Sequence, residues 1–245
     1  MKTRVYALRC TKEMIRDPLN MAFGLGFPLV LMLLLTAIQA NVPVPLFAID
    51  RLAPGMVVFG LSFIALFSAT LISKDRSTSF LMRLYASPMR AGDFILGYTA
   101  PLLPMAVGQG IVCFLAAMIL GLEPSFRILL SLLTMMPAAV LFIGIGLLCG
   151  AVFNDKQVGG ICGALLTNLS AWLSGTWFDL DLVGGAFKAV AEALPFCHAV
   201  NAGRAALAGD YAGILPELWW VIGYAAVVMV CAVLVFRRKM SADAR

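Results

Sequence analysis

The chain has 245 residues, of which 62% are hydrophobic and 13% are charged. A soluble domain averages about 45–50% apolar and about 25% charged residues, so this composition excludes an ordinary soluble globular protein. Six windows of 19 to 32 residues contain no Asp, Glu, Lys or Arg, and an α-helix needs about 20 residues to cross a bilayer about 30 Å thick. We therefore predict an all-α integral membrane protein, and nucleic-acid binding is excluded as its main role.

The charge-free windows predict six transmembrane helices in a single domain, residues 1–245. A segment at residues 1–17 precedes them, in which Val5, Leu8, Met14 and Ile15 fall near one helical face among basic residues. This pattern is typical of a helix in the headgroup layer of a membrane, although a solvated charged tail fits it equally well. The predicted spans are 19–39, 52–73, 94–121, 128–153, 157–178 and 218–236.

A cleaved signal peptide is the alternative interpretation of the first span. Signal peptides have apolar regions of about 7–15 residues, whereas the uncharged stretch here runs from residue 18 to residue 49. The length of this stretch favours a retained helix.

The Lys and Arg residues divide unequally between the two sides of the predicted membrane. The N-terminal segment, the second-to-third and fourth-to-fifth connections and the tail together hold 14 of them, and the other side holds 4. Acidic residues divide 6 to 7. Because loops rich in Lys and Arg stay in the cytoplasm, both termini are predicted to be cytoplasmic.

The spans lack the groups that several kinds of membrane protein require. No carboxylate, Lys or Arg lies near the middle of a span, which argues against an ion-coupled transporter, although backbone carbonyls can also bind sodium. The single histidine, His198, excludes a Ser–His dyad within a span and a two-histidine metal site. We expect no catalytic, cofactor-binding or metal-binding residues in this chain.

Small residues recur at helical spacing in two spans. Gly146 and Gly150 form a GxxxG pattern in the fourth span. Such residues let helix backbones approach closely in a membrane, and they serve either packing within the chain or a subunit interface. The second set, in the fifth span, comprises Gly159, Gly163, Thr167, Ser170 and Ser174.

The connection between the fifth and sixth spans is unusually apolar for a loop. Pro195 divides it into two short helical pieces, 182–194 and 197–208. Apolar helical pieces that are too short to cross the membrane are expected to lie in, or dip into, its outer leaflet and to cap a cavity. His198 and Arg204 in this connection could contact a substrate or an anionic headgroup at the outer surface.

The connection between the second and third spans predicts a short amphipathic helix at 77–87. Ser77 or Thr78 can cap this helix, and Pro88 ends it. One face of it is apolar, and arginines flank this face. Such a helix can rest on lipid headgroups or fit a groove on a partner protein. The apolar face comprises Phe80, Leu81, Leu84 and Tyr85.

This connection resembles the signature of type-2 ABC exporter membrane subunits, the permeases of bacterial drug, polysaccharide and lipo-oligosaccharide exporters. Asp75-Arg76, Thr78, Arg83-Leu84 and Ser87-Pro88 match the family pattern. Ser77 replaces the usual Gly, and Asp75 stands where Glu is commoner. Residues 194–200, together with Arg204 and Gly209, are similar to the family's outward segment before the last span.

The resemblance implies an ATP-driven exporter permease in the bacterial inner membrane. Two permeases, identical copies or paralogues, would pair, and each would dock on an ATPase subunit through the helix at 77–87, called the coupling helix. The chain has no GxxxxGK[ST] loop, so ATP and Mg would be bound by the ATPase alone. The contacts expected with the ATPase are Asp75, Arg76, Thr78, Phe80, Leu81, Arg83, Leu84 and Tyr85.

The substrate is expected to be amphipathic or lipid-linked, because the spans carry no charge. The small residues of the fifth span would serve permease–permease packing. An ion-coupled secondary transporter or a channel is the alternative function. Aromatic residues that could line a path, or could instead face lipid, are Phe23, Phe27, Phe59, Phe63, Trp172 and Trp177.

Overall fold

The computed structural model describes residues 2–42, 47–78 and 91–243, and every regular element in these ranges is a helix. This confirms the predicted all-α class. The π-helices are η1 (Ala22–Gly26) and η2 (Gly159–Leu166). The other helices are α1 (Lys2–Ile15), α2 (Pro18–Met21), α3 (Phe27–Gln39), α4 (Ile49–Ser77), α6 (Ala91–Ile119), α7 (Phe126–Thr134), α8 (Met136–Val152), α9 (Asp155–Val158), α10 (Thr167–Leu173), α11 (Leu180–Val183), α12 (Gly185–Ala193), α13 (Pro195–Ala208) and α14 (Tyr211–Asp243).

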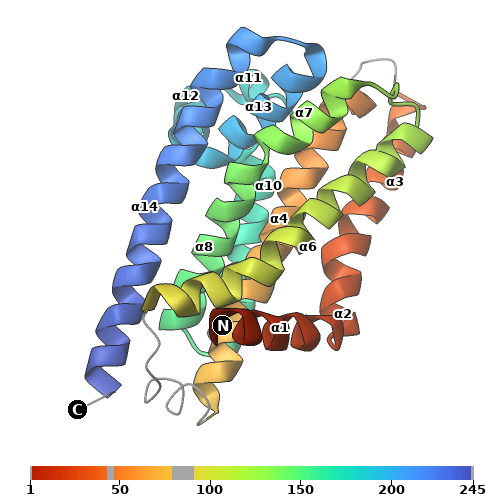
Figure 1. Ribbon diagram of the computed structural model, residues 1–245. Coiled ribbons are helices and arrows are strands. Elements are labelled where there is room, and N and C mark those ends of the chain that lie inside the picture. Colours follow the sequence, from red (N-terminus) through yellow and green to blue (C-terminus); the bar gives the residue numbers. More distant parts are fainter. Residues whose placement is uncertain (1, 43–46, 79–90, 244–245) are drawn as a thin grey trace.

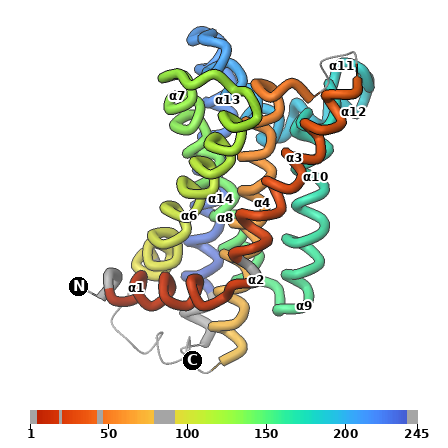
Figure 2. The backbone as a smooth tube through the Cα atoms, turned by 90° about the vertical axis from the view of Figure 1, so that its right-hand side faces the viewer, coloured from red at the N-terminus to blue at the C-terminus, as the bar shows by residue number. Residues whose placement is uncertain are grey.

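The long helices form an elongated bundle, and α1 lies across one end of it (Figure 1). We call this end, which also holds α9 and the last turns of α14, the terminal end, because both chain termini lie there (Figures 1 and 2). The opposite end, which we call the distal end, carries α7, α11, α12 and α13. The C-terminal end of α4 and the N-terminal end of α6 both lie at the terminal end.

Five helical segments within the described residues are long and apolar enough to cross a membrane: Ala22–Gln39, Ile49–Ser77, Gly92–Ile119, Phe126–Val152 and Tyr211–Arg238. The predicted count of six spans is therefore not confirmed. The predicted span at 157–178 falls on α9, η2 and α10, which together cover only residues 155–173. Asp155, Lys156, Gln157 and Asn168 lower the hydropathy of this stretch.

Helix α4 is the central helix of the bundle. In its most apolar 18-residue stretch 89% of the residues are buried, compared with 17% for α14. Helix α8 approaches α4 closely at Gly146 and Gly150, where an added Cβ would lie 2.2 Å from the Ala65 carbonyl oxygen and 2.5 Å from that of Ala69. This GxxxG pair therefore packs two helices of the same chain against each other.

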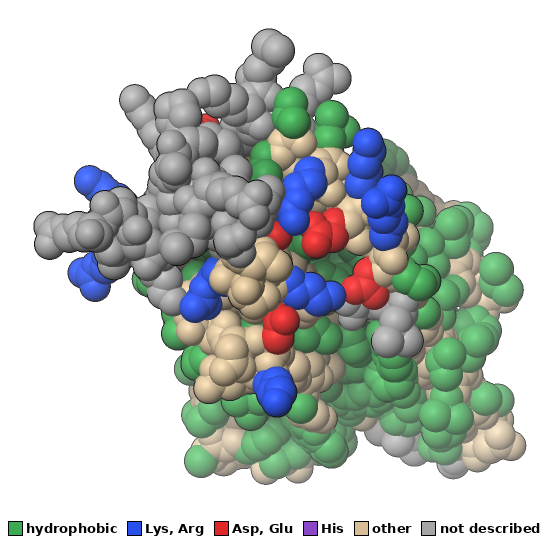
Figure 3. All heavy atoms as spheres, turned by 90° about the horizontal axis from the view of Figure 1, so that it is seen from below, with side chains coloured by type: hydrophobic (Ala, Val, Ile, Leu, Met, Phe, Trp, Pro, Cys, Tyr) green, Lys and Arg blue, Asp and Glu red, His purple; other side chains and the backbone are tan. Residues whose placement is uncertain are grey.

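The outer faces of the bundle expose large apolar side chains, among them Val30, Leu115 and Val227. Continuous exposed apolar surface of this kind is uncommon on soluble proteins and suits contact with lipid. Charged side chains gather at the ends instead, and Figure 3 shows Lys and Arg mixed with Asp and Glu on the terminal end.

The distal connection differs in detail from its prediction. The piece expected at 182–194 is two helices, α11 and α12, because Gly184 and Gly185 between them adopt positive φ angles of 61° and 55°. A positive φ is strained for residues with a Cβ, so only glycine makes this break without cost. Pro195 begins α13, where its missing N–H is no loss.

Candidate functional site

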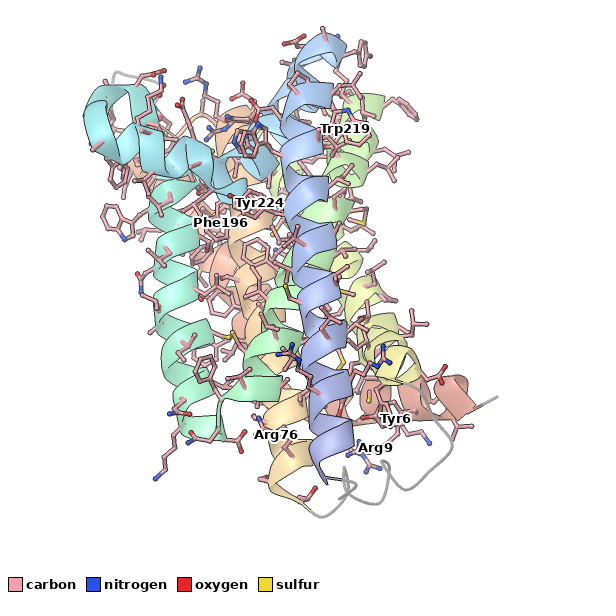
Figure 4. All side chains as sticks on the ribbon, turned by 90° about the vertical axis from the view of Figure 1, so that its left-hand side faces the viewer. Tyr6, Arg9, Arg76, Phe196, Trp219 and Tyr224 are labelled. Atoms are coloured by element: carbon pink, nitrogen blue, oxygen red, sulfur yellow. The ribbon has the colours of Figure 1, made fainter. Side chains whose placement is uncertain are left out.

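Four successive residues at the end of α4, Ser73 to Arg76, each contact a different part of the bundle. We call these residues and their partners the terminal junction. Figure 4 shows Arg76 at this end of the bundle, near Tyr6 and Arg9 of α1. The junction lies directly before the connection at 79–90, for which a coupling helix was predicted.

Asp75 is the buried centre of the junction, with 2% of its surface exposed. Arg9 donates two hydrogen bonds to the two carboxylate oxygens, at 2.8 and 2.6 Å. Tyr98 donates a third at 2.8 Å and Tyr6 a fourth at 3.2 Å. Bidentate pairs between arginine and a carboxylate are among the stronger hydrogen-bonded contacts in proteins, so Asp75 holds α1, α4 and α6 together.

The protonation states of the titratable side chains of α1 fit these hydrogen bonds. The hydrogen bond to Asp75 raises the pKa of the Arg9 guanidinium above its usual value. Burial raises the pKa of the Tyr6 phenol and raises that of the Cys10 thiol to about 12. Arg9 therefore stays charged, and Tyr6 stays a neutral hydrogen-bond donor at physiological pH.

The neighbours of Asp75 contact three further segments. Arg76 donates to the carbonyl oxygens of Gly150 at 2.9 Å and Phe153 at 3.2 Å, at the C-terminal end of α8. A cation there also interacts favourably with the helix dipole. Two more contacts complete the junction: Ser73 donates to Asp155 of α9, and Lys74 lies 3.6 Å from Asp17, which follows α1.

The predicted ATPase contacts divide between described and undescribed residues. The side chains of Asp75 and Arg76 contact this chain itself, and their role in ATPase contact stays a prediction. Thr78, just past the end of α4, is exposed, and its hydroxyl donates to the Asp75 carbonyl oxygen at 3.0 Å. Phe80, Leu81, Arg83, Leu84 and Tyr85 lie outside the described residues, as does most of the predicted helix at 77–87.

Sequence reasoning missed the partners of Asp75. It assigned α1 one apolar face, but Val5, Leu8 and Ile15 on that face are exposed. The side that packs on the bundle carries Tyr6 and Cys10 instead. Gly97 of α6 is the sequence feature that bears on this contact, because the absence of a side chain leaves room for α1. An added Cβ at Gly97 would lie 2.4 Å from the Tyr6 ring.

The small residues of the fifth predicted span do not share one environment. Thr167, Ser170 and Ser174 are buried within the chain, and each hydroxyl donates to a backbone carbonyl three to five residues earlier, in η2 or α10. Gly163 faces Leu66 of α4, whereas an added Cβ at Gly159 would meet nothing within 4 Å. Whether any of them packs against a second permease stays a prediction.

Aromatic side chains that are distant in the sequence meet in a groove of about 560 Å³ between η1–α3, α4 and η2–α10. We call it the aromatic groove. Ring centroids lie 5.7 Å apart for Phe27 and Phe63 and 5.8 Å apart for Phe59 and Trp177. Among the described residues that line the groove none is charged, and both π-helices contribute to its walls. The aromatic lining is Phe23, Phe27, Phe59, Phe63, Trp172 and Trp177.

A polar cavity of about 720 Å³ opens at the distal end and contains both His198 and Arg204. The Arg204 guanidinium donates to the carbonyl oxygens of Arg51 at 3.1 Å and Gly175 at 2.9 Å. Burial and the charge of Arg51 lower the pKa of Arg204 to about 10. The cavity also has six lining carboxylates, those of Asp50, Asp179, Asp181, Glu192, Asp210 and Glu217.

The helical bundle, its apolar outer faces and its charged ends define a multi-pass membrane protein. Comparison with protein families places the chain further: the family model of the ABC-2 type transporter matches residues 1–208. The chain belongs to this family and is an ABC transporter permease, which associates with an ABC ATPase partner. A comparison with curated proteins finds no match.

Proposed function

We propose that the protein is the permease of an ATP-driven exporter that moves an amphipathic or lipid-linked substrate out of the cytoplasm or the inner leaflet. The observation that carries this proposal is the aromatic groove, because its uncharged lining suits apolar or aromatic groups and excludes an isolated charge. The groove lies beside the exposed apolar faces of η1 and α3, so a substrate in the lipid can reach it directly.

The terminal junction is the proposed route by which the ATPase moves the bundle. The ATPase, with its ATP and Mg, would dock on the coupling helix at 77–87. A displacement of this segment reaches the last turn of α4, whose side chains contact α1, α6, α8 and α9. Because packed helices move as rigid elements, the tilt of α4 would change the walls of the aromatic groove.

The distribution of basic residues supports a bacterial inner-membrane location with cytoplasmic termini. Arg9, Lys74 and Lys156 lie at the terminal end, and Arg127 and Arg204 lie at the distal end. The terminal end is the basic side in the count over the whole sequence. It is also the end at which a cytoplasmic ATPase would have to dock.

A second permease, an identical copy or a paralogue, is proposed to pack beside the aromatic groove. Gly159 is exposed on η2 with free space around it, and small residues favour close helix contacts in membranes. Pairing at this face would place two aromatic grooves next to each other and enclose a path between them.

The docking proposal predicts that Leu84→Asp or Tyr85→Asp abolishes co-purification of the ATPase while membrane insertion stays normal. A carboxylate on the apolar face of the coupling helix would have to lose its hydration in the ATPase cleft. The matched control is Leu182→Asp, at an exposed leucine of the distal end, which should leave co-purification unchanged. Variants at 84 and 85 that hold the ATPase with wild-type affinity would contradict the proposal.

The substrate proposal predicts that Trp172→Ala weakens the stimulation of ATP hydrolysis by lipids or compounds that the wild-type complex responds to. Loss of one aromatic contact in the groove should raise the half-maximal concentration by about two- to tenfold. Trp219→Ala is the matched control, because Trp219 is a similarly exposed tryptophan on α14, away from the groove. Equal effects of the two substitutions would remove the groove from the substrate path.

An ion-coupled transporter would behave differently in the same reconstituted system. Transport that persists without ATP and collapses with the proton gradient would identify that mechanism. Transport that requires ATP hydrolysis by the partner supports the proposal made here.

A further inference from the structure

His198, on α13 at the distal end, contacts two other helices through both of its ring nitrogens. Nδ1 meets a carboxylate oxygen of Glu217 on α14, and Nε2 lies 2.7 Å from the backbone carbonyl oxygen of Glu192 on α12. The indole of Trp220 stacks on the imidazole, with ring centroids 5.1 Å apart and planes 3° from parallel. His198 thus joins the three helices α12, α13 and α14.

The hydrogen-bond partners determine how many protons this arrangement holds. A backbone carbonyl only accepts, so Nε2 must carry a proton. The contact between Nδ1 and Glu217 requires a second proton, on the imidazole or on the carboxyl group. Without it, two lone pairs would face each other. When this second proton is lost, the imidazole keeps a single N–H, so it can donate to Glu217 or to the Glu192 carbonyl oxygen but not to both.

Charged groups on every neighbouring element act on this pair. Helix α12 contributes Glu192, which is paired with Lys188 at 3.4 Å, and α14 contributes Glu217. Asp210 precedes α14, and Arg204 follows on α13, while Asp50, Arg51, Asp179 and Asp181 line the same cavity. Burial is the largest single influence and opposes the charged imidazole, but the hydrogen bonds to Glu217 and to the Glu192 carbonyl, together with the negative charges of both carboxylates, outweigh it and raise the pKa of His198 above the usual 6.5.

We propose that His198, Glu217 and Trp220 form a proton-dependent latch that holds α12 and α13 against α14 and so controls access to the distal cavity. The latch is closed when the pair holds its second proton. Because the pKa of His198 is raised in the folded chain, the stabilisation is complete below about pH 6.5. It is lost as the pH rises through the raised value. The proposal is independent of the substrate and of the ATPase.

Cys197 provides a probe beside the latch. Its side chain is buried, with 1% exposed, and its thiol lies 3.0 Å from the Ala191 carbonyl oxygen of α12. A soluble thiol reagent can reach it only when α12 moves away. Labelling of Cys197 can be followed by mass spectrometry in the purified full-length chain, and a small free thiol labelled in the same solution reports on the general reactivity of the reagent.

The test compares wild type with His198→Gln at the same pH, so that the reactivity of the thiol itself cancels. At about pH 6, Cys197 of the variant should react about fivefold faster than that of wild type, and at about pH 9 the two rates should converge. Glu217→Gln should behave like His198→Gln. A ratio of rates that stays constant between these pH values would overturn the proposal.

A second measurement needs no substitution. Hydrogen exchange of the wild-type chain, corrected for the intrinsic effect of pH, should show protection of the backbone amides at residues 189–194, in the last turns of α12, falling as the pH rises through the pKa of His198. Protection in helix α8 should stay constant. Parallel changes in the two regions, or no change at residues 189–194, would show that His198 is not a latch.

Discussion

Asp75→Ala is expected to destabilise the chain by about 3 kcal/mol, because it removes the acceptor that Arg9 and the Tyr6 and Tyr98 hydroxyls share at a buried site. Arg9 keeps its ion pair with Glu13 at 2.9 Å. The substitution should also separate α1 from α4, so co-purification of the ATPase should fall along with stability. Chemical denaturation of the purified chain measures the first effect, and recovery of the ATPase on the tagged permease measures the second.

The control for this prediction is Asp50→Asn, at the opposite end of α4. Asp50 is exposed in the first turn of the same helix, so its replacement should change the free energy of unfolding by about 0.5 kcal/mol or less. Asp75→Asn separates the effect of charge from the effect of shape. Asparagine keeps the volume of the side chain and removes the negative charge that pairs with Arg9. Wild-type stability in Asp75→Asn and Asp75→Ala would show that the junction does not hold α1 in place.

Gly146→Ala is expected to be the most damaging single-methyl change in the bundle. The added Cβ would lie 2.2 Å from the Ala65 carbonyl oxygen and 2.6 Å from the Ser68 Cβ, and backbone atoms cannot move aside as a flexible side chain can. Helices α4 and α8 would have to separate along their whole contact. We expect a loss of about 3 kcal/mol or more, at the upper end of the range for overpacked cores, seen as a lower thermal midpoint.

Gly159→Ala is the matched control in the second small-residue set. Nothing lies within 4 Å of the added methyl, and alanine is favoured over glycine inside a helix by about 0.5–1 kcal/mol. The fold should therefore tolerate it. If η2 forms the contact with a second permease, Gly159→Leu should weaken pairing in a cross-linking assay while the isolated chain unfolds as wild type does. A folding defect in Gly159→Ala equal to that in Gly146→Ala would contradict the assignment of the two sets.

The two GxxxG patterns show where the sequence stops being informative. Both have the same spacing, and sequence reasoning left packing and interface open for each. Gly146 proves to face the central helix of the chain, whereas Gly159 faces free space. Small residues permit close approach of a second helix, but which helix approaches is decided by the arrangement of the whole bundle.

The terminal junction shows the same limit of prediction from the sequence. The sequence predicted a functional segment beginning near Asp75, and the structure shows Asp75 buried among residues of α1 and α6. Arg9 lies 66 positions away in the chain, and the helical periodicity of the segment at 1–17 placed it only among the basic residues around the apolar face. Periodicity identifies an apolar face but not which of several faces the protein covers.

By itself the sequence determined the class of the protein, because the cost of placing charge in lipid is high enough to leave charge-free windows that can be read directly. It also determined the separation of basic residues between the two ends and the position of the break at Pro195. Only the tertiary structure decided which aromatic residues form one groove, which glycines meet a neighbouring helix and which acceptors surround His198. These depend on contacts between helices distant in the chain, and such contacts arise from the packing of complete surfaces rather than from local pattern.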